Sequence, residues 1–125
     1  MASYCTLGTN DPAKAVAFYD AVLGTAGIER FFEHPSGGAV YGKDGKVTFG
    51  IIGPFNKEPA TVGNGTMIGF EGASREVVDA MHAKALELGG TCEGAPGLRG
   101  PDGGDFYFAY FRDLEGNKLC AFKIG

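Results

Sequence analysis

The residues of this chain that could carry out chemistry are few and widely spaced. The 125 residues include 2 histidines and 3 cysteines. His34 stands in a predicted connection, and His82 stands in the middle of a predicted helix, off its apolar face. We find no paired carboxylates and no serine, histidine and aspartate set, the arrangements that acid–base and nucleophilic catalysis need. The candidates that remain are thiols, aromatic rings and isolated cations.

The cysteines are odd in number and include no CxxC pair, which indicates reduced thiols in a cytoplasmic protein and no disulfide framework; they are Cys5, Cys92 and Cys120. A nucleophilic thiol needs a nearby cation or a helix N-terminus to lower its pKa. The neighbours of Cys120 are instead apolar, so a buried, unreactive thiol is the favoured interpretation. A sensor or detoxifier of electrophiles acting through Cys120 stays open as an alternative.

The densest aromatic segment runs from residue 106 to 111. Side chains alternate along a strand, so one face would carry Phe106, Phe108 and Tyr110. That face could line a ligand pocket, or the strand could be buried on both sides. Arg99 stands in a loop rich in proline and glycine. If it turned inward, its planar guanidinium would suit a carboxylate or phosphate; a solvated loop arginine is the plainer alternative.

Composition predicts one ordinary globular domain, with 44% hydrophobic and 21% charged residues. The net charge of -4 and the pI near 5.1 disfavour a nucleic-acid partner. No run approaches the roughly 20 apolar residues of a membrane span, and the N-terminus does not resemble a signal peptide. Glycine accounts for 22 residues, in short clusters between periodic segments, which predicts many tight turns and therefore many strands.

Two helices are predicted from apolar periodicity, over residues 11–23 and 74–88. Asp11 and Ser74 can cap their N-termini, Gly24 is expected to stop the first, and Gly89 to end the second. A short strand precedes each helix, and several short strands separated by glycine follow it. In the first half, Asp44 and Gly45 are predicted to form a turn that leads into the last of these strands. The same element order therefore occurs twice.

This repeat predicts an α+β fold of two βαβββ modules in one domain, residues 1–125. Module one covers residues 1–53, a linker covers 54–64, and module two covers 65–125. Two such modules, each a curved open sheet with a helix on its outer face, could bury their inner faces around a common cavity.

Three segments make the chain resemble the vicinal oxygen chelate superfamily, which includes glyoxalase I, bleomycin- and fosfomycin-resistance proteins and extradiol dioxygenases. They are LGTND leading into AFY and LG (residues 7–24), GTMIGF (65–70) and FYFAYFRDLEGNKL (106–119). The resemblance covers essentially the whole chain. It implies paired modules that usually hold a metal inside an open barrel, and a homodimer. In the fosfomycin-resistance branch a tyrosine with the spacing of Tyr110 faces the substrate.

The positions that match the metal ligands of the superfamily carry other residues here. They are Tyr4, Met67 and Cys120, where the catalytic branches have histidine, histidine and glutamate. A phenol, a thioether and a thiol form a poor set for Mg, Mn, Fe or Ni, so we expect no metal. Plain packing, a pocket lining and, least favoured, a soft-metal site for Cu(I) stay open for these residues.

The leading hypothesis is a metal-free small-molecule-binding protein without a cofactor, which holds its ligand in an aromatic, partly apolar cavity. Its expected ligand-binding residues are Tyr4, Met67, Arg99, Phe108, Tyr110 and Cys120. The alternative is a glyoxalase-like lyase or isomerase, or a dioxygenase, that uses a divalent metal. The electrophile sensor acting through a cysteine is the third hypothesis.

Overall fold

The computed structural model describes residues 3–101 and 104–125. The chain divides into two compact units, Met1–Val62 and Gly63–Gly125. Each unit contains one helix and one four-stranded sheet in the order βαβββ. The predicted α+β fold of two βαβββ modules is therefore confirmed. None of the helices in the described ranges is both long and apolar enough to cross a membrane.

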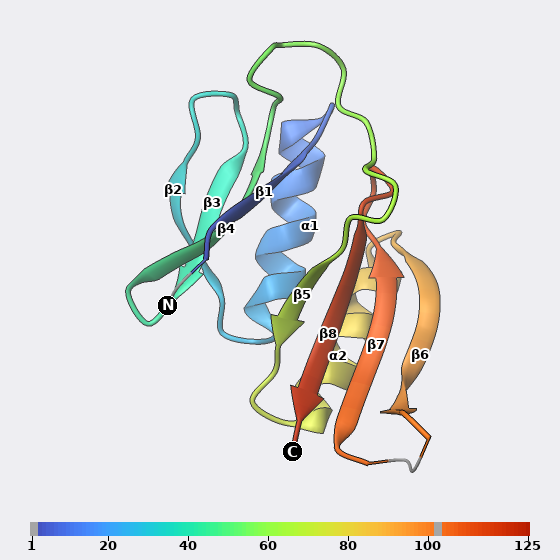
Figure 1. Cartoon of the computed structure of the whole chain (residues 1–125). Coiled ribbons are helices and arrows are strands. Elements are labelled where there is room, and N and C mark those ends of the chain that lie inside the picture. The colour runs from blue at the N-terminus through green and yellow to red at the C-terminus, as the bar shows by residue number, and fades with distance from the viewer. Residues whose placement is uncertain (1–2, 102–103) are drawn as a thin grey trace. The chain divides into compact units, whose positions relative to one another are not determined.

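Module one consists of β1 (Cys5–Gly8), α1 (Pro12–Gly24), β2 (Glu29–Glu33), β3 (Ala39–Lys43) and β4 (Lys46–Ile52). Its strand order is β1-β4-β3-β2, with β1 parallel to β4 and the other neighbours antiparallel (Figure 1). Asp44 and Gly45 both have positive φ, 53° and 77°. That is the geometry of a tight turn between two antiparallel strands, as expected for this segment.

Module two consists of β5 (Ile68–Glu71), α2 (Arg75–Glu87), β6 (Thr91–Arg99), β7 (Phe106–Arg112) and β8 (Lys118–Ile124). Its order is β5-β8-β7-β6, with β5 parallel to β8 and the rest antiparallel. The second sheet therefore repeats the topology of the first, and β6 forms its edge. In Figure 1, α2 lies along one face of this sheet.

Both helices begin where their capping residues predict. The Asp11 carboxylate accepts a hydrogen bond from the Lys14 amide at 3.2 Å, and the Ser74 hydroxyl accepts one from the Val77 amide at 3.3 Å. Each bond satisfies one of the amides that a first helical turn leaves free. The predicted stop of α1 at Gly24 is wrong, because Gly24 is still helical and Thr25 is the cap.

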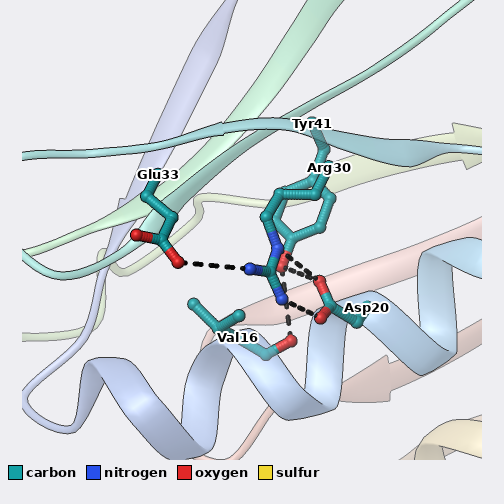
Figure 2. Close-up of polar contacts among 5 residues, drawn as sticks. All are labelled: Val16, Asp20, Arg30, Glu33 and Tyr41. Carbon is teal, nitrogen blue, oxygen red and sulfur yellow. Dashed lines mark hydrogen bonds and ion pairs between the residues drawn. The ribbon is translucent and has the colours of Figure 1, made fainter.

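The core of module one is aromatic and lies between α1 and the sheet. The Tyr19 ring lies 5.1 Å from that of Phe49 and 6.3 Å from that of Tyr41, measured between centroids. All three side chains are buried. Figure 2 shows the polar end of this cluster, where the Tyr41 hydroxyl donates to Asp20 of α1 at 2.9 Å. Burial, and then this bond, raise the pKa of Tyr41 well above its ordinary value.

Arg30 of β2 completes the contact between sheet and helix in module one. Its guanidinium pairs with the Asp20 carboxylate through two nitrogens, and more loosely with Glu33 at 3.5 Å (Figure 2). Asp20 therefore accepts hydrogen bonds from two strands, β2 and β3. These bonds fix the helix against the sheet in one orientation.

The core of module two is mostly aliphatic. Val78, Met81 and Ala85 of α2 are fully buried, and the sheet beneath them presents small and apolar residues, Ala109, Phe111, Leu119 and Ala121. The prediction that His82 lies off the apolar face is wrong. His82 is only 7% exposed, and its ring meets Phe111 edge-on at 6.3 Å. An imidazole at this position packs as a flat, partly apolar body.

The turn between β7 and β8 is structural, as its acidic and glycine residues predict. The buried Asp113 carboxylate accepts hydrogen bonds from the amides of Glu115 and Asn117, at 2.9 and 2.8 Å, and from the Asn117 side chain at 2.9 Å. Arg112 donates to the Gly116 carbonyl at 2.9 Å. These bonds give the D-L-E-G-N sequence a structural role in closing the turn.

Candidate ligand-binding face of module two

Three aromatic rings lie on the face of the module-two sheet that is turned away from α2. On the other face, the Tyr107 hydroxyl donates to Asp79 of α2 at 2.6 Å and Phe111 meets His82. Alternation along β7 therefore places Phe108 and Tyr110 on the far face. The predicted alternation of this segment agrees with these contacts.

The rings of this face stack on one another across two strands. Phe108 lies 5.9 Å from Tyr110 and 5.3 Å from Phe122 of β8, with interplanar angles of 20° and 16°. All three side chains are half-buried. We call Phe108, Tyr110 and Phe122 the aromatic strip. Near-parallel rings at these distances form one continuous aromatic surface.

Two cations border the aromatic strip. The Arg99 guanidinium and the Lys118 ammonium each lie 5.5 Å from the centre of the Tyr110 ring, within the range of a cation–π contact. Arg99 also donates to the Ala95 carbonyl at 2.6 Å. It was expected in a loop, but it is the last residue of β6. From there its side chain lies back along the strand toward Tyr110.

Glycines make room for this arrangement. A methyl group on Gly94 would come within 3.0 Å of the Tyr110 ring and 3.3 Å of the Arg99 guanidinium, and one on Gly97 within 3.0 Å of the same guanidinium. On the same face, a methyl group on Gly69 of β5 would lie 3.0 Å from the Cys120 sulfur and 3.2 Å from the Phe122 ring. Side chains of the far face therefore fill the space above these glycines.

Cys120 lies within this face but is inaccessible. It pairs with Tyr110 in the β7–β8 register and with Gly69 in the β5–β8 register, and it is 1% exposed. Burial raises the pKa of its thiol to about 11, and Lys118 opposes that shift only in part. At neutral pH the sulfur is therefore protonated and a poor nucleophile.

The structure brings together four of the six expected site residues, namely Arg99, Phe108, Tyr110 and Cys120. Met67 lies one residue before β5 and is 43% exposed. Tyr4 belongs to module one, where its hydroxyl lies 3.1 Å from the point at which Gly50 would carry a methyl group. It is 53% exposed. Among residues 3–101 and 104–125, no group of three or more His, Cys, Asp or Glu side chains is arranged to hold a metal ion.

Sequence reasoning missed Phe122, Lys118 and the three glycines of this face. Phe122 and Lys118 are two residues on either side of Cys120, so alternation along the final strand could have found them. The roles of the glycines depend on register between strands, which the sequence does not state.

Module one contains a hollow of about 780 Å³ between the start of α1 and the ends of β2 and β4. His34, Ser36 and Phe55 are among the residues that line it. The Ser36 hydroxyl lies 2.8 Å from Nδ1 of His34 and accepts from the Gly53 amide at 2.9 Å. The Ser36 amide also donates to Nδ1, at 3.1 Å. These short-range bonds hold the β2–β3 turn.

Comparison with known proteins shows the family to which this chain belongs. The model of the glyoxalase/bleomycin resistance protein/dioxygenase superfamily matches residues 2–121. The chain therefore belongs to this superfamily. No curated protein matches it significantly.

Solved structures agree with this assignment. A glyoxalase/bleomycin resistance protein from Albidiferax ferrireducens is 44% identical, with a TM-score of 0.85 over 96% of this chain and 95% of that one. A family enzyme from Burkholderia phytofirmans (21% identity, TM-score 0.71, 98% of each chain) shares the fold. So does a lactoylglutathione lyase from Agrobacterium tumefaciens (22% identity, TM-score 0.67, 98% of this chain and 92% of that one).

Proposed function

We propose that this protein binds a small molecule against the aromatic strip of module two and needs no metal to do so. The observation that carries the proposal is the placing of two cations beside three stacked rings on one sheet face. Hydrophobic and aromatic side chains with a few placed polar groups are the usual lining of a small-molecule site, and this face provides both.

The chemistry of this face favours a flat, apolar ligand that carries an anionic group. The rings of Phe108, Tyr110 and Phe122 offer stacking surface. Arg99 can present a planar fork to a carboxylate or phosphate, and Lys118 can add a second positive charge. Both cations already lie over Tyr110, so little reorganisation would be needed when the ligand binds.

Met67 and Cys120, which the sequence also predicts to bind the ligand, have the following roles in this proposal. Met67, one residue before β5, would serve as a wall of the site, where its thioether can adapt to an irregular apolar ligand. Cys120 would lie beneath the ligand as a packed thiol. Together these residues replace the histidine and carboxylate ligands of the catalytic branches with a set that suits no hard divalent ion.

Binding can be tested with pairs of aromatic carboxylates and their neutral amides, followed by calorimetry. We expect each carboxylate to bind at least about tenfold more tightly than its amide, a difference of about 1.4 kcal/mol. Arg99→Gln and Lys118→Gln should remove that preference, and Tyr110→Ala should weaken both ligands. Tyr107→Phe, on the opposite face of the same strand, is the matched control. Equal affinity for acid and amide would contradict the anionic class.

The metal-free part of the proposal has its own test. Protein purified without a metal-affinity tag or chelator should contain well under one equivalent of Ni, Zn, Mn or Fe by elemental mass spectrometry. Addition of these ions should leave the melting temperature unchanged, since an ion that binds only the folded state raises it. One tightly bound equivalent per chain would instead favour a metal-dependent lyase, isomerase or dioxygenase.

We also propose an assembly and a location for the protein. The superfamily resemblance favours a homodimer of single-domain chains, which light scattering after size exclusion would test. The three reduced thiols favour the cytoplasm, which fractionation of the source cells would test.

A further inference from the structure

A thiol and an imidazole meet on the helix side of module two, away from the aromatic strip. The Cys92 sulfur lies 3.2 Å from Nε2 of His82. Cys92 is exposed on the edge strand β6, whereas His82 is held in α2 with 7% of its surface exposed. The thiol therefore belongs to an exposed residue of an edge strand, while its neighbour is fixed by packing against Phe111.

The surroundings keep His82 able to accept a proton. Burial lowers its pKa, and the nearby Asp79 carboxylate on α2 opposes that shift only in part. His82 is therefore neutral at pH 7, with a lone pair available on one nitrogen. Of the charged groups on the adjoining strands, Glu93 of β6 is paired with Arg112 of β7 at 2.7 Å. The opposite charges of Glu93 and Arg112 therefore largely cancel in the surroundings of Cys92 and His82.

The other two cysteines lack this combination. Cys120 is buried, and its thiol pKa is raised to about 11. Cys5 is half-buried and its sulfur lies 3.7 Å from the Thr48 carbonyl, with burial raising its pKa. Cys92 alone of the three is exposed and has an imidazole within hydrogen-bond reach.

We infer that Cys92 and His82 form a modification site for soft carbon electrophiles, such as α,β-unsaturated carbonyl compounds and α-halo amides. His82 takes the thiol proton as the sulfur attacks. With an unsaturated carbonyl, the new S–C bond forms at the β-carbon, the C=C electron pair moves to the α-carbon, and the proton is returned there. With a halo amide, the S–C bond replaces the carbon–halogen bond, halide leaves, and the imidazolium releases its proton to solvent.

The first test uses the unaltered protein and iodoacetamide at pH 7, with the label at each cysteine quantified by peptide mass spectrometry. Each rate is measured in the folded protein and in the same chain unfolded in urea. Exposure alone would make every cysteine react faster when unfolded. We expect the reverse for Cys92, at least about threefold faster when folded, because His82 acts as its base only in the native state. Cys5 and Cys120 should be slower when folded. A folded Cys92 that reacts no faster than the unfolded one overturns the inference.

The second test removes the base. His82→Gln keeps a polar side chain of similar size, and we expect it to slow Cys92 labelling about tenfold while Cys5 labelling is unchanged. His34→Gln, at the other histidine of the chain, is the matched control, and circular dichroism checks that each variant folds. Unchanged Cys92 labelling in a folded His82→Gln variant would overturn the inference; should that variant not fold, the folded and unfolded rates of the unaltered protein decide it.

Discussion

The two modules share one strand order but differ in which face of the sheet carries their main cluster of aromatic rings. In module one, Tyr41 and Phe49 face the helix and bury their rings against Tyr19. In module two, Phe108 and Tyr110 lie on the face turned away from the helix and stay half-buried. The βαβββ topology therefore does not dictate where aromatic surface goes.

What lies under each helix explains how this difference is possible. Module two packs α2 on small residues such as Ala109 and Ala121, with Leu119 and two buried rings, Phe70 and Phe111. The core under α2 is filled without the rings of the aromatic strip, so these rings are available to contact a ligand. Module one uses its rings for its own stability. This difference between the modules implies that removing a ring should affect stability in module one and ligand binding in module two.

The largest expected effect is on the stability of module one. Phe49→Ala removes a fully buried ring and should lower the free energy of unfolding by about 3–5 kcal/mol. Phe108→Ala removes a half-buried ring, and we expect a loss of about 1–2 kcal/mol. Urea denaturation measures both. Equal losses would contradict the division of roles, because Phe108 would then be a core residue like Phe49.

A second pair compares the polar contacts between strand and helix in the two modules. Tyr41→Phe removes a buried donor to Asp20 and should cost about 1–3 kcal/mol, since a buried hydrogen bond to a charged group is lost. Tyr107→Phe removes the donor to Asp79, which is exposed to water, and should cost much less because water replaces the tyrosine. Thermal melts of both variants test this order. A larger loss from Tyr107→Phe would show that the module-two contact is the more important one.

The smallest expected effect is a dependence of stability on pH that comes from His82 of module two. The pKa of His82 is lower in the folded protein than its ordinary 6.5, so the unfolded chain binds its proton first as pH falls. The stability that neutral His82 contributes is complete above pH 6.5 and is lost as pH falls through 6.5 toward the folded pKa. Urea midpoints between pH 5 and 8 should therefore fall toward pH 5. His82→Gln should flatten that slope, while His34→Gln, in module one, should retain it; an unchanged slope in His82→Gln would contradict the assignment.

Much of the fold could be predicted because its signals are local. Asp11 and Ser74 cap helices in which apolar residues recur at helical spacing, and Asp44 and Gly45 make the expected turn. The alternation of Phe108 and Tyr110 with Tyr107 and Phe111 likewise depends only on neighbours along the strand. The repeat of these signals was enough to predict two βαβββ modules.

The errors concern contacts between elements. The helical pattern predicts that His82 lies off the apolar face of its helix, but the edge strand β6 and Phe111 cover it. The glycines and prolines of residues 95–101 predict a loop around Arg99, but Arg99 is the last residue of β6. The glycines of β6 instead allow a strand in which side chains of other residues occupy the space beside the backbone. A helix or strand pattern cannot show what its neighbour contributes.

By itself, then, the sequence determined the element order, the caps, the turns and the superfamily, since each depends on residues close together in the chain or on a matching pattern along it. Only the tertiary structure decided that Arg99 and Lys118 meet over Tyr110, that Phe122 extends the aromatic strip, and that Cys92 and not Cys120 lies beside an imidazole. Each of these contacts joins different strands, or a strand and a helix. Strand register and helix packing set such distances, and both result from how the whole module buries its apolar surface.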